Sequence, residues 1–280
     1  MNILITGSEG FIGSNIVANL YNYDIITLDK KADVGLNINL SKPFKIKSNI
    51  DVIIHEAAIT DTTANYKVIS ENVDGFINIL KLAIDKNADL IYASSASVYG
   101  NGPVPMAESQ KLNPLNPYAE SKAIIDHMAK QYMDKIKIIG LRYFNCFGQW
   151  ENHKGKMSSM IYQLRNKILS NQRPKLFKYG EQVRDHIYVK DVVDATIKAI
   201  KAKKSGIYNI GSGVGTSWND LLNIANKVLK TDLEPIYIDN PNQSAYQNYT
   251  KASIKLAKKE IHWEPNWELK NAIKDYYQKI

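Results

Sequence analysis

A tyrosine and a lysine four residues apart, Tyr118 and Lys122, are well suited to proton transfer. In a helix, residues at i and i+4 lie on one face with their side chains one turn apart. A lysine ammonium beside a phenol favours the phenolate, so we expect Lys122 to lower the pKa of Tyr118 toward neutrality. Tyr118 could then remove a hydroxyl proton while hydride leaves the same carbon. The alternative is a chance pair on an ordinary helix, and the preceding Asn116-Pro117 and upstream serines argue against it.

Those serines lie in the segment Ser94-Ser95-Ala96-Ser97, directly after a predicted strand at residues 89–93. In an open parallel sheet, ligands bind at the carboxyl ends of the strands. A serine at this edge could hydrogen-bond both the tyrosine and a substrate oxygen. The alternative is an ordinary polar loop.

Three glycines at three-residue spacing, Gly7, Gly10 and Gly13, lie between an apolar strand and a helix. This arrangement directs backbone N–H groups and a helix N-terminus at one point, where a pyrophosphate can bind. A Cβ would block the tight turn, the approach of phosphate or the packing of helix on strand. We therefore predict a dinucleotide site, with Phe11 and Ile12 in the same turn, rather than a plain loop.

Asp29 ends the next predicted strand, at residues 24–28. An acid at this position can hydrogen-bond the adenosine ribose hydroxyls, which favours NAD. Lys30 and Lys31 follow at once and could neutralise a 2′-phosphate, which favours NADP, or they could simply be solvated. The sequence therefore predicts NAD or NADP without choosing between them.

The single cysteine, Cys146, excludes an internal disulfide and fits a reducing compartment. No apolar run approaches the length of a membrane span, and residues 1–6 already form a predicted strand, so no signal peptide is visible. We expect a cytoplasmic protein without a membrane partner. The five histidines show no ligand spacing with one another or with the cysteine, so we predict no metal.

The formal net charge is +8, but the lysines and arginines are scattered along the chain rather than gathered on one element. This pattern does not favour nucleic acid as a partner. The same charge would attract a small anionic substrate.

Strands and helices alternate through the first half of the chain, which predicts a parallel sheet covered on both faces. We predict an α/β fold, with a Rossmann-type doubly wound parallel sheet in residues 1–148 and a smaller C-terminal substrate-binding lobe in residues 149–280. Some later segments are expected to return to the sheet. Irregular stretches at 149–156 and 239–250 are candidate substrate loops. The predicted strands are 1–6, 24–28, 34–38, 51–55, 89–93, 136–141, 175–178 and 206–210, and the predicted helices are 15–20, 68–85, 118–133, 157–169, 191–200, 217–228, 254–259 and 268–277.

The motifs of the chain resemble, in order and spacing, those of the extended short-chain dehydrogenase/reductases that act on nucleotide sugars. The resemblance covers essentially the whole chain. The motifs are Gly7/Gly10/Gly13, His55-Glu56-Ala57-Ala58, Glu71-Asn72-Val73-Asp74-Gly75, Ser94 to Gly100, Tyr118 with Lys122, Arg142-Tyr143-Phe144-Asn145 and Arg184 to Val192.

This resemblance implies roles for particular residues. Ser95, Tyr118 and Lys122 would form the catalytic triad. Asn145 and Arg184 would bind the substrate diphosphate, a task suited to amide and guanidinium donors. Two other cations lie in the same motifs: Arg142 is expected to pack structurally, and Lys190 is expected to be solvated. Besides the glycine turn, Asp29 and Lys30, the cofactor would contact Asn37, Ile38, Ala57, Ala58, Asn72 and Ser94, together with Tyr118 and Lys122.

Within this family the chain is most similar to ADP-glycero-manno-heptose 6-epimerases. The similarity is carried by Asp61-Thr62-Thr63, His153 to Ser159, Pro174 to Phe177, and Tyr246-Gln247 with Thr250. It implies that Lys154 faces the sugar opposite Tyr118 and serves as a second acid and base; otherwise Lys154 is a solvated loop lysine. The substrate would also contact Ser97, His153, Lys175 and Tyr246. Two departures are the shorter chain and Ala245, where an arginine is expected, so the pocket could accept another sugar.

The resemblance predicts an enzyme that oxidises a nucleotide-diphosphate sugar transiently and reduces it again with inversion of one carbon. NAD or NADP would stay tightly bound, because no net redox change occurs. The alternatives are UDP-hexose 4-epimerisation, with the same serine, tyrosine and lysine, a sugar-nucleotide dehydratase, and a non-catalytic NAD(P)-binding protein. Relatives pair through two helices of the sheet domain, here about 65–85 and 117–133, so we expect a homo-oligomer.

Overall fold

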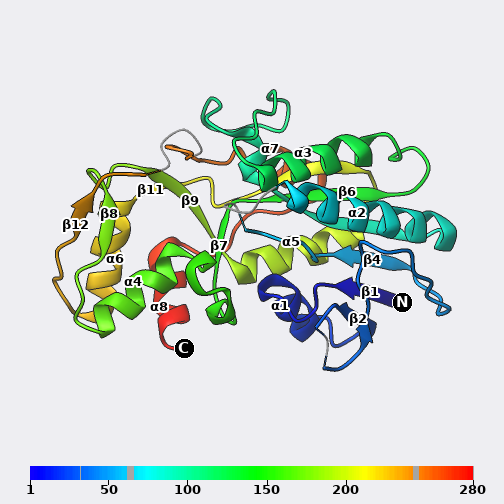
Figure 1. Ribbon diagram of the computed structural model, residues 1–280, viewed down its shortest axis with the longest axis horizontal. Helices are drawn as coiled ribbons and strands as arrows, with labels where there is room; N and C mark the ends of the chain where they lie inside the picture. Colours follow the sequence, from blue (N-terminus) through cyan, green and yellow to red (C-terminus); the bar gives the residue numbers. More distant parts are fainter. Residues whose placement is uncertain (32, 62–65, 242–245, 280) are drawn as a thin grey trace.

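The centre of the protein is a seven-stranded parallel sheet (Figure 1). The computed structural model describes all residues except 32, 62–65, 242–245 and 280. Thr62 and Thr63 of the heptose-epimerase motif, and Ala245, where an arginine was expected, therefore lie outside the described residues. In spatial order the strands are β10 (Gly206–Ile210), β6 (Ile138–Tyr143), β5 (Asp89–Ser95), β4 (Val52–His55), β1 (Asn2–Thr6), β2 (Asp24–Asp29) and β3 (Leu36–Asn37).

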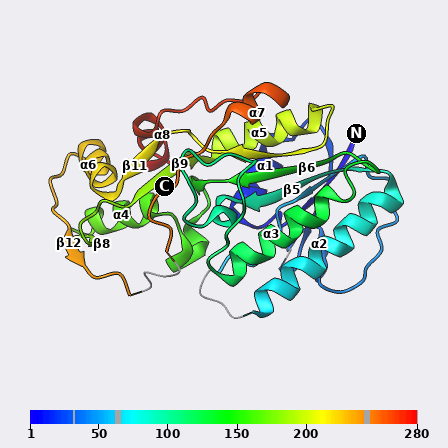
Figure 2. The same ribbon diagram turned by 90° about the horizontal axis from the view of Figure 1, so that it is seen from above.

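Helices cover both faces of this sheet, because its central strands are apolar on both sides (Figure 2). One face packs against α2 (Lys67–Lys86) and α3 (Pro117–Lys130), which lie side by side. The other face packs against α1 (Phe11–Asn19) and α5 (Val189–Lys201). The predicted doubly wound Rossmann-type fold is confirmed.

The chain order reverses between β1 and β4, the neighbours at the middle of the sheet. From β1 the chain proceeds outward through β2 and β3, and it then returns to β4 and continues in the opposite direction. The connections diverge here and leave a crevice at the carboxyl ends of the strands. This crevice is where the glycine turn lies.

A second, smaller body lies beside the sheet, at the left of Figure 1. It has its own apolar core, built mainly from helices. Its strands are β7 (Asn145–Phe147), β9 (Val183–Tyr188) and β11 (Gly215–Ser217) in one sheet, and β8 (Lys175–Phe177) with β12 (Ile236–Ile238) in another. The remaining helices of the chain are α4 (Met160–Leu169), α6 (Trp218–Leu229), α7 (Lys255–Glu260) and α8 (Leu269–Tyr277), with short 3-10 helices η1 (Ala96–Tyr99) and η2 (Asn152–Met157).

Several predicted boundaries were wrong. The third strand, predicted at 34–38, has only two residues, and strands β7, β9, β11 and β12 were not predicted. Strands β7, β11 and β12 have only three residues each and β9 carries Arg184 and Asp185, so none of them has a long apolar run. Their partners lie far away in the chain. The stretch 149–156, predicted as irregular, contains η2. Two elements that follow residue 148 in the chain, α5 and β10, pack in the sheet domain.

A buried ion pair fixes α3 on the sheet. Arg142 Nε lies 2.8 Å from Asp126 Oδ2, and each side chain is only 1% exposed. Tyr92 donates a hydrogen bond to the other oxygen of Asp126 (2.9 Å), and Arg142 donates to Tyr99 (2.8 Å). The network therefore links α3 to β5, β6 and the segment after β5. Because α3 begins with Tyr118 and carries Lys122, this network sets where both residues lie.

Replacing Arg142 alone should be strongly destabilising. In Arg142→Met, the Asp126 carboxylate stays buried without its cation, which we expect to cost about 3–5 kcal/mol in the free energy of unfolding. The double variant Arg142→Met/Asp126→Leu should recover most of that loss, because no charge is left unpaired. Urea unfolding followed by circular dichroism measures both. A loss below about 1 kcal/mol in the single variant, typical of exposed pairs, would contradict this role.

Candidate active site

The glycine turn is closely packed and open to one side. Gly7 has a φ of +71°, and a Cβ on it would lie 2.6 Å from the backbone nitrogen of Ala57. A Cβ on Gly13 would lie 2.0 Å from the Gly7 carbonyl oxygen. The turn therefore holds β1, α1 and the segment after β4 together in a way that only glycine permits. It places the N-terminus of α1 at the crevice.

Three adjoining cavities follow the carboxyl edge of the sheet, with volumes of about 340, 290 and 390 Å³. We call them the glycine cavity, beside Gly7, Asp29 and Ala57; the tyrosine cavity, beside Ser94, Tyr118 and Lys122; and the arginine cavity, beside Asn145 and Arg184. Neighbouring cavities share lining residues, so they form one cleft. Such a row of concave spaces can accept an extended ligand on each side of the tyrosine.

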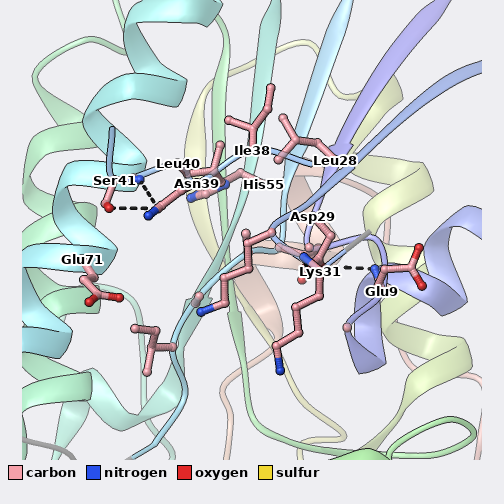
Figure 3. Close-up of a pocket in the computed structure, with 18 of the residues that line it drawn as sticks. Glu9, Leu28, Asp29, Lys31, Ile38, Asn39, Leu40, Ser41, His55 and Glu71 are labelled. Atoms are coloured by element: carbon pink, nitrogen blue, oxygen red, sulfur yellow. Dashed lines mark hydrogen bonds between the residues drawn. The ribbon is translucent and has the colours of Figure 1, made fainter. Parts of the chain in front are cut away.

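The end of β2 closes one side of the glycine cavity (Figure 3). The Asp29 carboxylate accepts hydrogen bonds from the backbone nitrogens of Glu9 (3.3 Å) and Lys31 (3.1 Å). The exposed Lys30 and Lys31 line the same cavity. One carboxylate and two lysines therefore border the place where a ribose would lie.

The other predicted cofactor contacts divide into two groups. Ile38, Ala57, Ala58 and Asn72 line the glycine cavity. Asn37 is exposed, pairs with β2 and does not line it; Asn39 does so instead. Phe11, Ile12 and Ser94 line the tyrosine cavity.

The amide of Asn72 is already occupied by the protein. It accepts from Ile59 N (2.8 Å) and donates to Ile59 O (3.1 Å) and Ser121 Oγ (3.0 Å). Asn72 therefore fastens the segment after β4 to α3. Its contact with a ligand can only be through the outer face of the side chain.

The residues along the first two cavities fit a dinucleotide. The glycine turn leaves room that a Cβ would fill, and an α-helix N-terminus faces it. Two buried hydroxyls nearby, Ser8 Oγ and Ser94 Oγ, have no hydrogen-bond partner. Buried hydroxyls of this kind are rare without a ligand or water to satisfy them.

Tyr118 lies in the first turn of α3, which Asn116 caps by accepting a hydrogen bond from Ala119 N (2.9 Å). Lys122 is only 3% exposed and donates to the carbonyl of Ala93 (2.7 Å). Its Nζ lies 5.9 Å from the centre of the Tyr118 ring. Tyr118 and Lys122 therefore share a cavity, as the i, i+4 spacing implies, and the ammonium is anchored on β5.

The expected lowering of the Tyr118 pKa is wrong for this arrangement. Burial raises the pKa of Tyr118, a hydrogen bond with Ser95 lowers it, and the nearby Glu56 carboxylate raises it. The Lys122 ammonium donates its hydrogen bond to the backbone carbonyl of Ala93 rather than to the phenol oxygen. Burial also lowers the pKa of Lys122 itself, to about 8.

Ser95 lies beside Tyr118, with which it shares a hydrogen bond, and lines the arginine cavity. Its hydroxyl accepts hydrogen bonds from Ser97 N (3.2 Å) and Ser97 Oγ (2.9 Å). Ser95, Ser97 and Tyr118 all line this cavity. The chain thus places two hydroxyls and a phenol around one space.

Arg184 is the main cation of the arginine cavity. It is buried between the rings of Trp218 and Tyr246, with its guanidinium carbon 5.7 and 4.7 Å from their centres. Burial lowers the pKa of Arg184, though a guanidinium stays charged near neutral pH. Asn145 lies alongside and donates to Asp185 O (3.2 Å). A buried cation flanked by an amide and aromatic rings suits an anionic group with an attached ring system.

Two predicted substrate residues do not line this cavity. His153 lines the glycine and tyrosine cavities. Lys175 lies exposed on β8 and lines none of the three. The strand pairing of β8 with β12, which was not predicted, accounts for the position of Lys175.

Lys154 lies on η2, half-buried, and lines both the tyrosine and the arginine cavities together with Tyr118. Its Nζ lies 5.3 Å from the centre of the Phe11 ring. The segment is held by the buried Glu151, which accepts hydrogen bonds from Gly148 N (3.1 Å) and the hydroxyl of Tyr276 (3.0 Å) on α8. The C-terminal helix therefore supports the loop that carries Lys154.

Some residues that line the cleft were not predicted from the sequence. His186 is 4% exposed, lines the arginine cavity, and has no hydrogen-bond partner at either ring nitrogen. Burial and the Arg184 charge lower the pKa of His186 to about 3, so the ring is neutral. Trp218 and Glu56 were also missed. Both His186 and Glu56 lie inside motifs quoted above, which was the available signal.

Among the described residues, no group of three or more His, Cys, Asp or Glu side chains is placed to hold a metal ion. In the same part of the chain, no helix combines the length and the apolar character that crossing a membrane requires.

Known proteins are similar to this chain in sequence and in fold. The NAD dependent epimerase/dehydratase family matches residues 3–211. The chain is 34% identical to an ADP-L-glycero-D-manno-heptose-6-epimerase of Brachyspira hyodysenteriae, over 98% of this chain and 96% of the relative. It is 36% identical to the Fusobacterium nucleatum protein of that name, over 99% and 97%. A crystal structure of the Helicobacter pylori protein of that name has a TM-score of 0.92 and 34% identity, covering 99% of this chain and 95% of that one.

A methyl group on Gly13 should weaken dinucleotide binding. In Gly13→Ala the new Cβ would meet the Gly7 carbonyl at 2.0 Å, so the turn must shift. Overpacking of this kind costs about 1–3 kcal/mol, which predicts a roughly 10- to 100-fold weaker Kd for NAD. Titration of cofactor-depleted protein with NAD, followed by fluorescence, measures it.

Gly75→Ala is the matched control, because a Cβ at Gly75 lines the same cavity but makes only ordinary contact, 3.5 Å from Leu40 Cβ. Equal NAD affinity in Gly13→Ala and Gly75→Ala would contradict the role of the glycine turn in dinucleotide binding.

Proposed function

The chain belongs to the NAD dependent epimerase/dehydratase family, and on that premise we propose that it inverts C6 of an ADP-activated heptose, with the dinucleotide kept tightly bound. It is an NAD-dependent nucleotide-sugar epimerase. The heptose assignment is supported by the names of relatives that align with nearly its full length. The observation that carries the mechanism is the single cleft in which Tyr118 and Lys154 both face the space beside Ser95.

Proton transfer is assigned to Tyr118, with Ser95 as its hydrogen-bond partner. When bound, the oxidised nicotinamide ring supplies a hydride acceptor and a positive charge beside the phenol. Since burial raises the pKa of Tyr118, an added positive charge is needed to favour the phenolate. Tyr118 then takes the proton from the sugar hydroxyl as the carbon–hydrogen bond breaks.

Inversion requires hydride to return to the opposite face of the carbonyl carbon. The sugar must therefore turn within the cleft, and its oxygen needs a proton donor in the second presentation. Lys154 and Tyr118 line the same two cavities, which supports Lys154 as that donor. An ammonium on a loop held by Glu151 can supply the proton without rearrangement of the sheet.

Arg184 and Asn145 are proposed to bind the diphosphate, and the rings of Trp218 and Tyr246 to border the nucleoside. We add His186, whose unpartnered ring nitrogens are ready to hydrogen-bond an oxygen of the substrate. Ser97 lies on the sugar side of the same cavity. Residues 149–280 would thus supply most of the substrate lobe, apart from α5 and β10.

We propose that NADP is accepted as well as NAD, because Lys30 and Lys31 border the same cavity as Asp29. The NAD titration above, repeated with NADP, tests this, and failure of NADP to bind would exclude it.

We also propose that two copies of the chain pair through helices α2 and α3. Size-exclusion chromatography with light scattering measures the molar mass and so tests this pairing.

Substrate choice is tested directly by nuclear magnetic resonance. The protein is incubated separately with an ADP-heptose, UDP-glucose and UDP-glucuronate, and formation of each epimer is followed. We expect inversion of the heptose at C6. Conversion of UDP-glucose to its 4-epimer alone would replace the heptose assignment by 4-epimerisation.

In Lys154→Met, epimerisation should be lost while oxidation of the sugar continues. The oxidation is seen as the absorbance of reduced nicotinamide. Full epimerase activity in this variant would refute the role of Lys154.

Removal of the phenol hydroxyl should abolish turnover. In Tyr118→Phe we expect kcat to fall about 10²- to 10⁴-fold, because the proton acceptor is lost. NAD affinity should stay within about twofold of the wild type, since the glycine turn is untouched. Unchanged kcat would rule out Tyr118 as the acid and base.

A further inference from the structure

Glu56 is a carboxylate in the cleft that the mechanism above does not use. It directly follows β4 and lines both the glycine and the tyrosine cavities. The Tyr143 hydroxyl donates a hydrogen bond to Glu56 Oε1 (2.8 Å). A half-buried carboxylate beside a neutral phenol is costly unless a positive charge is nearby.

The nearby positive charge belongs to Lys122. This ammonium is 3% exposed and donates to the neutral carbonyl of Ala93. A buried cation with only neutral contacts is strongly unfavourable, so it needs a carboxylate within electrostatic range. Two carboxylates act on Lys122, those of Glu56 and Asp126.

Asp126 is already committed to another cation. One of its oxygens lies 2.8 Å from Arg142 Nε, and the other accepts from Tyr92. The charges of Asp126 and Arg142 cancel within their buried pair. The charge of Glu56 is left to balance Lys122, across the tyrosine cavity that both residues line.

We propose that Glu56 is the counter-ion of Lys122, and that it acts as a positioning residue for proton transfer at Tyr118. The inference rests on the proposed role of Tyr118, to which Lys122 is adjacent on α3. Glu56 keeps Lys122 charged and seated on β5. Lys122 in turn keeps a positive charge beside the phenol when the proton moves.

The surroundings of Glu56 contribute few other charges. Tyr143 on β6, Cys146 on β7 and Tyr118 on α3 face it as neutral groups, because burial raises the pKa of each. His55 is neutral, with its pKa lowered to about 3, and contacts Thr6 instead. Lys154 adds a positive charge through the same cavity.

The pair therefore has a narrow working range of pH. Burial raises the pKa of Glu56 to about 7 and lowers that of Lys122 to about 8. Below about 7 the carboxylate gains a proton and Lys122 loses its counter-ion. Above about 8 Lys122 loses its proton. We expect a bell-shaped dependence of kcat on pH with its maximum between these values.

The test compares Glu56→Gln with the wild-type holoenzyme. The amide keeps the shape and removes the charge, so kcat near neutral pH should fall about tenfold or more, the acid limb should vanish and the alkaline limb should move to lower pH. Tyr143→Phe is the matched control, because it removes the hydrogen bond and leaves the carboxylate. Since that bond lowers the pKa of Glu56, the control should move the acid limb to higher pH and leave the alkaline limb in place.

A second measurement does not depend on activity. Titration of the Lys122 Cε resonance in ¹³C-lysine-labelled protein, assigned with Lys122→Met, reports the ionisation of Lys122 directly. The Lys122 titration should shift to lower pH in Glu56→Gln and stay near the wild-type value in Glu56→Asp, which keeps the charge. If the glutamine variant does not fold, Glu56→Ala, which also removes the carboxylate, takes its place in the test. An unchanged Lys122 titration in a folded Glu56→Gln variant would overturn the proposal, even if kcat fell. Because this readout needs no turnover, it separates failure of the proposed counter-ion role of Glu56 from failure of Tyr118 as the acid and base.

Discussion

The burial of a lysine ammonium at the carboxyl edge of the sheet is the interaction on which the active site depends. Lys122 is almost fully enclosed and is held by a carbonyl of β5, so its charge must be balanced by carboxylates in fixed places. This requirement ties α3 to β4 through Glu56 and to β6 through the Asp126–Arg142 pair. The position of Tyr118, one helical turn before Lys122, follows from that arrangement.

The parallel sheet provides the frame because its strands end at one edge. Four features lie along that edge: the glycine turn after β1, the Asp29 carboxylate at the end of β2, Glu56 after β4 and Ser95 at the end of β5. The smaller body then adds Arg184 on β9 and Lys154 on η2 from the other side. A dinucleotide and a nucleotide sugar can therefore meet at Tyr118, which lies where the two sets of residues join.

The predictability of these features varied with the range of the interactions behind them. The apolar central strands and the glycine turn depend on neighbouring residues, and the sequence predicted both of them. Strands β7 and β9 exist because they pair with each other, with paired residues 41 positions apart in the chain, and both strands were missed. Lys175 was predicted from a motif to contact the substrate, yet its strand pairs with β12 and carries it away from the cleft. The predicted lowering of the Tyr118 pKa was wrong for a similar reason, since burial and the Glu56 carboxylate, which come from the folded structure, raise that pKa.

The sequence by itself determined the doubly wound sheet, the family and the pair Tyr118 and Lys122, because periodicity, glycine spacing and helical spacing are local properties of a chain. The tertiary structure alone decided which charges compensate one another. Glu56 and His186 looked unremarkable in their motifs, but folding half-buried Glu56 near Lys122 of α3 and buried the His186 ring beside Arg184 of its own strand. Electrostatic free energies depend on distance and burial rather than on position in the chain, so they become defined only when the chain is packed.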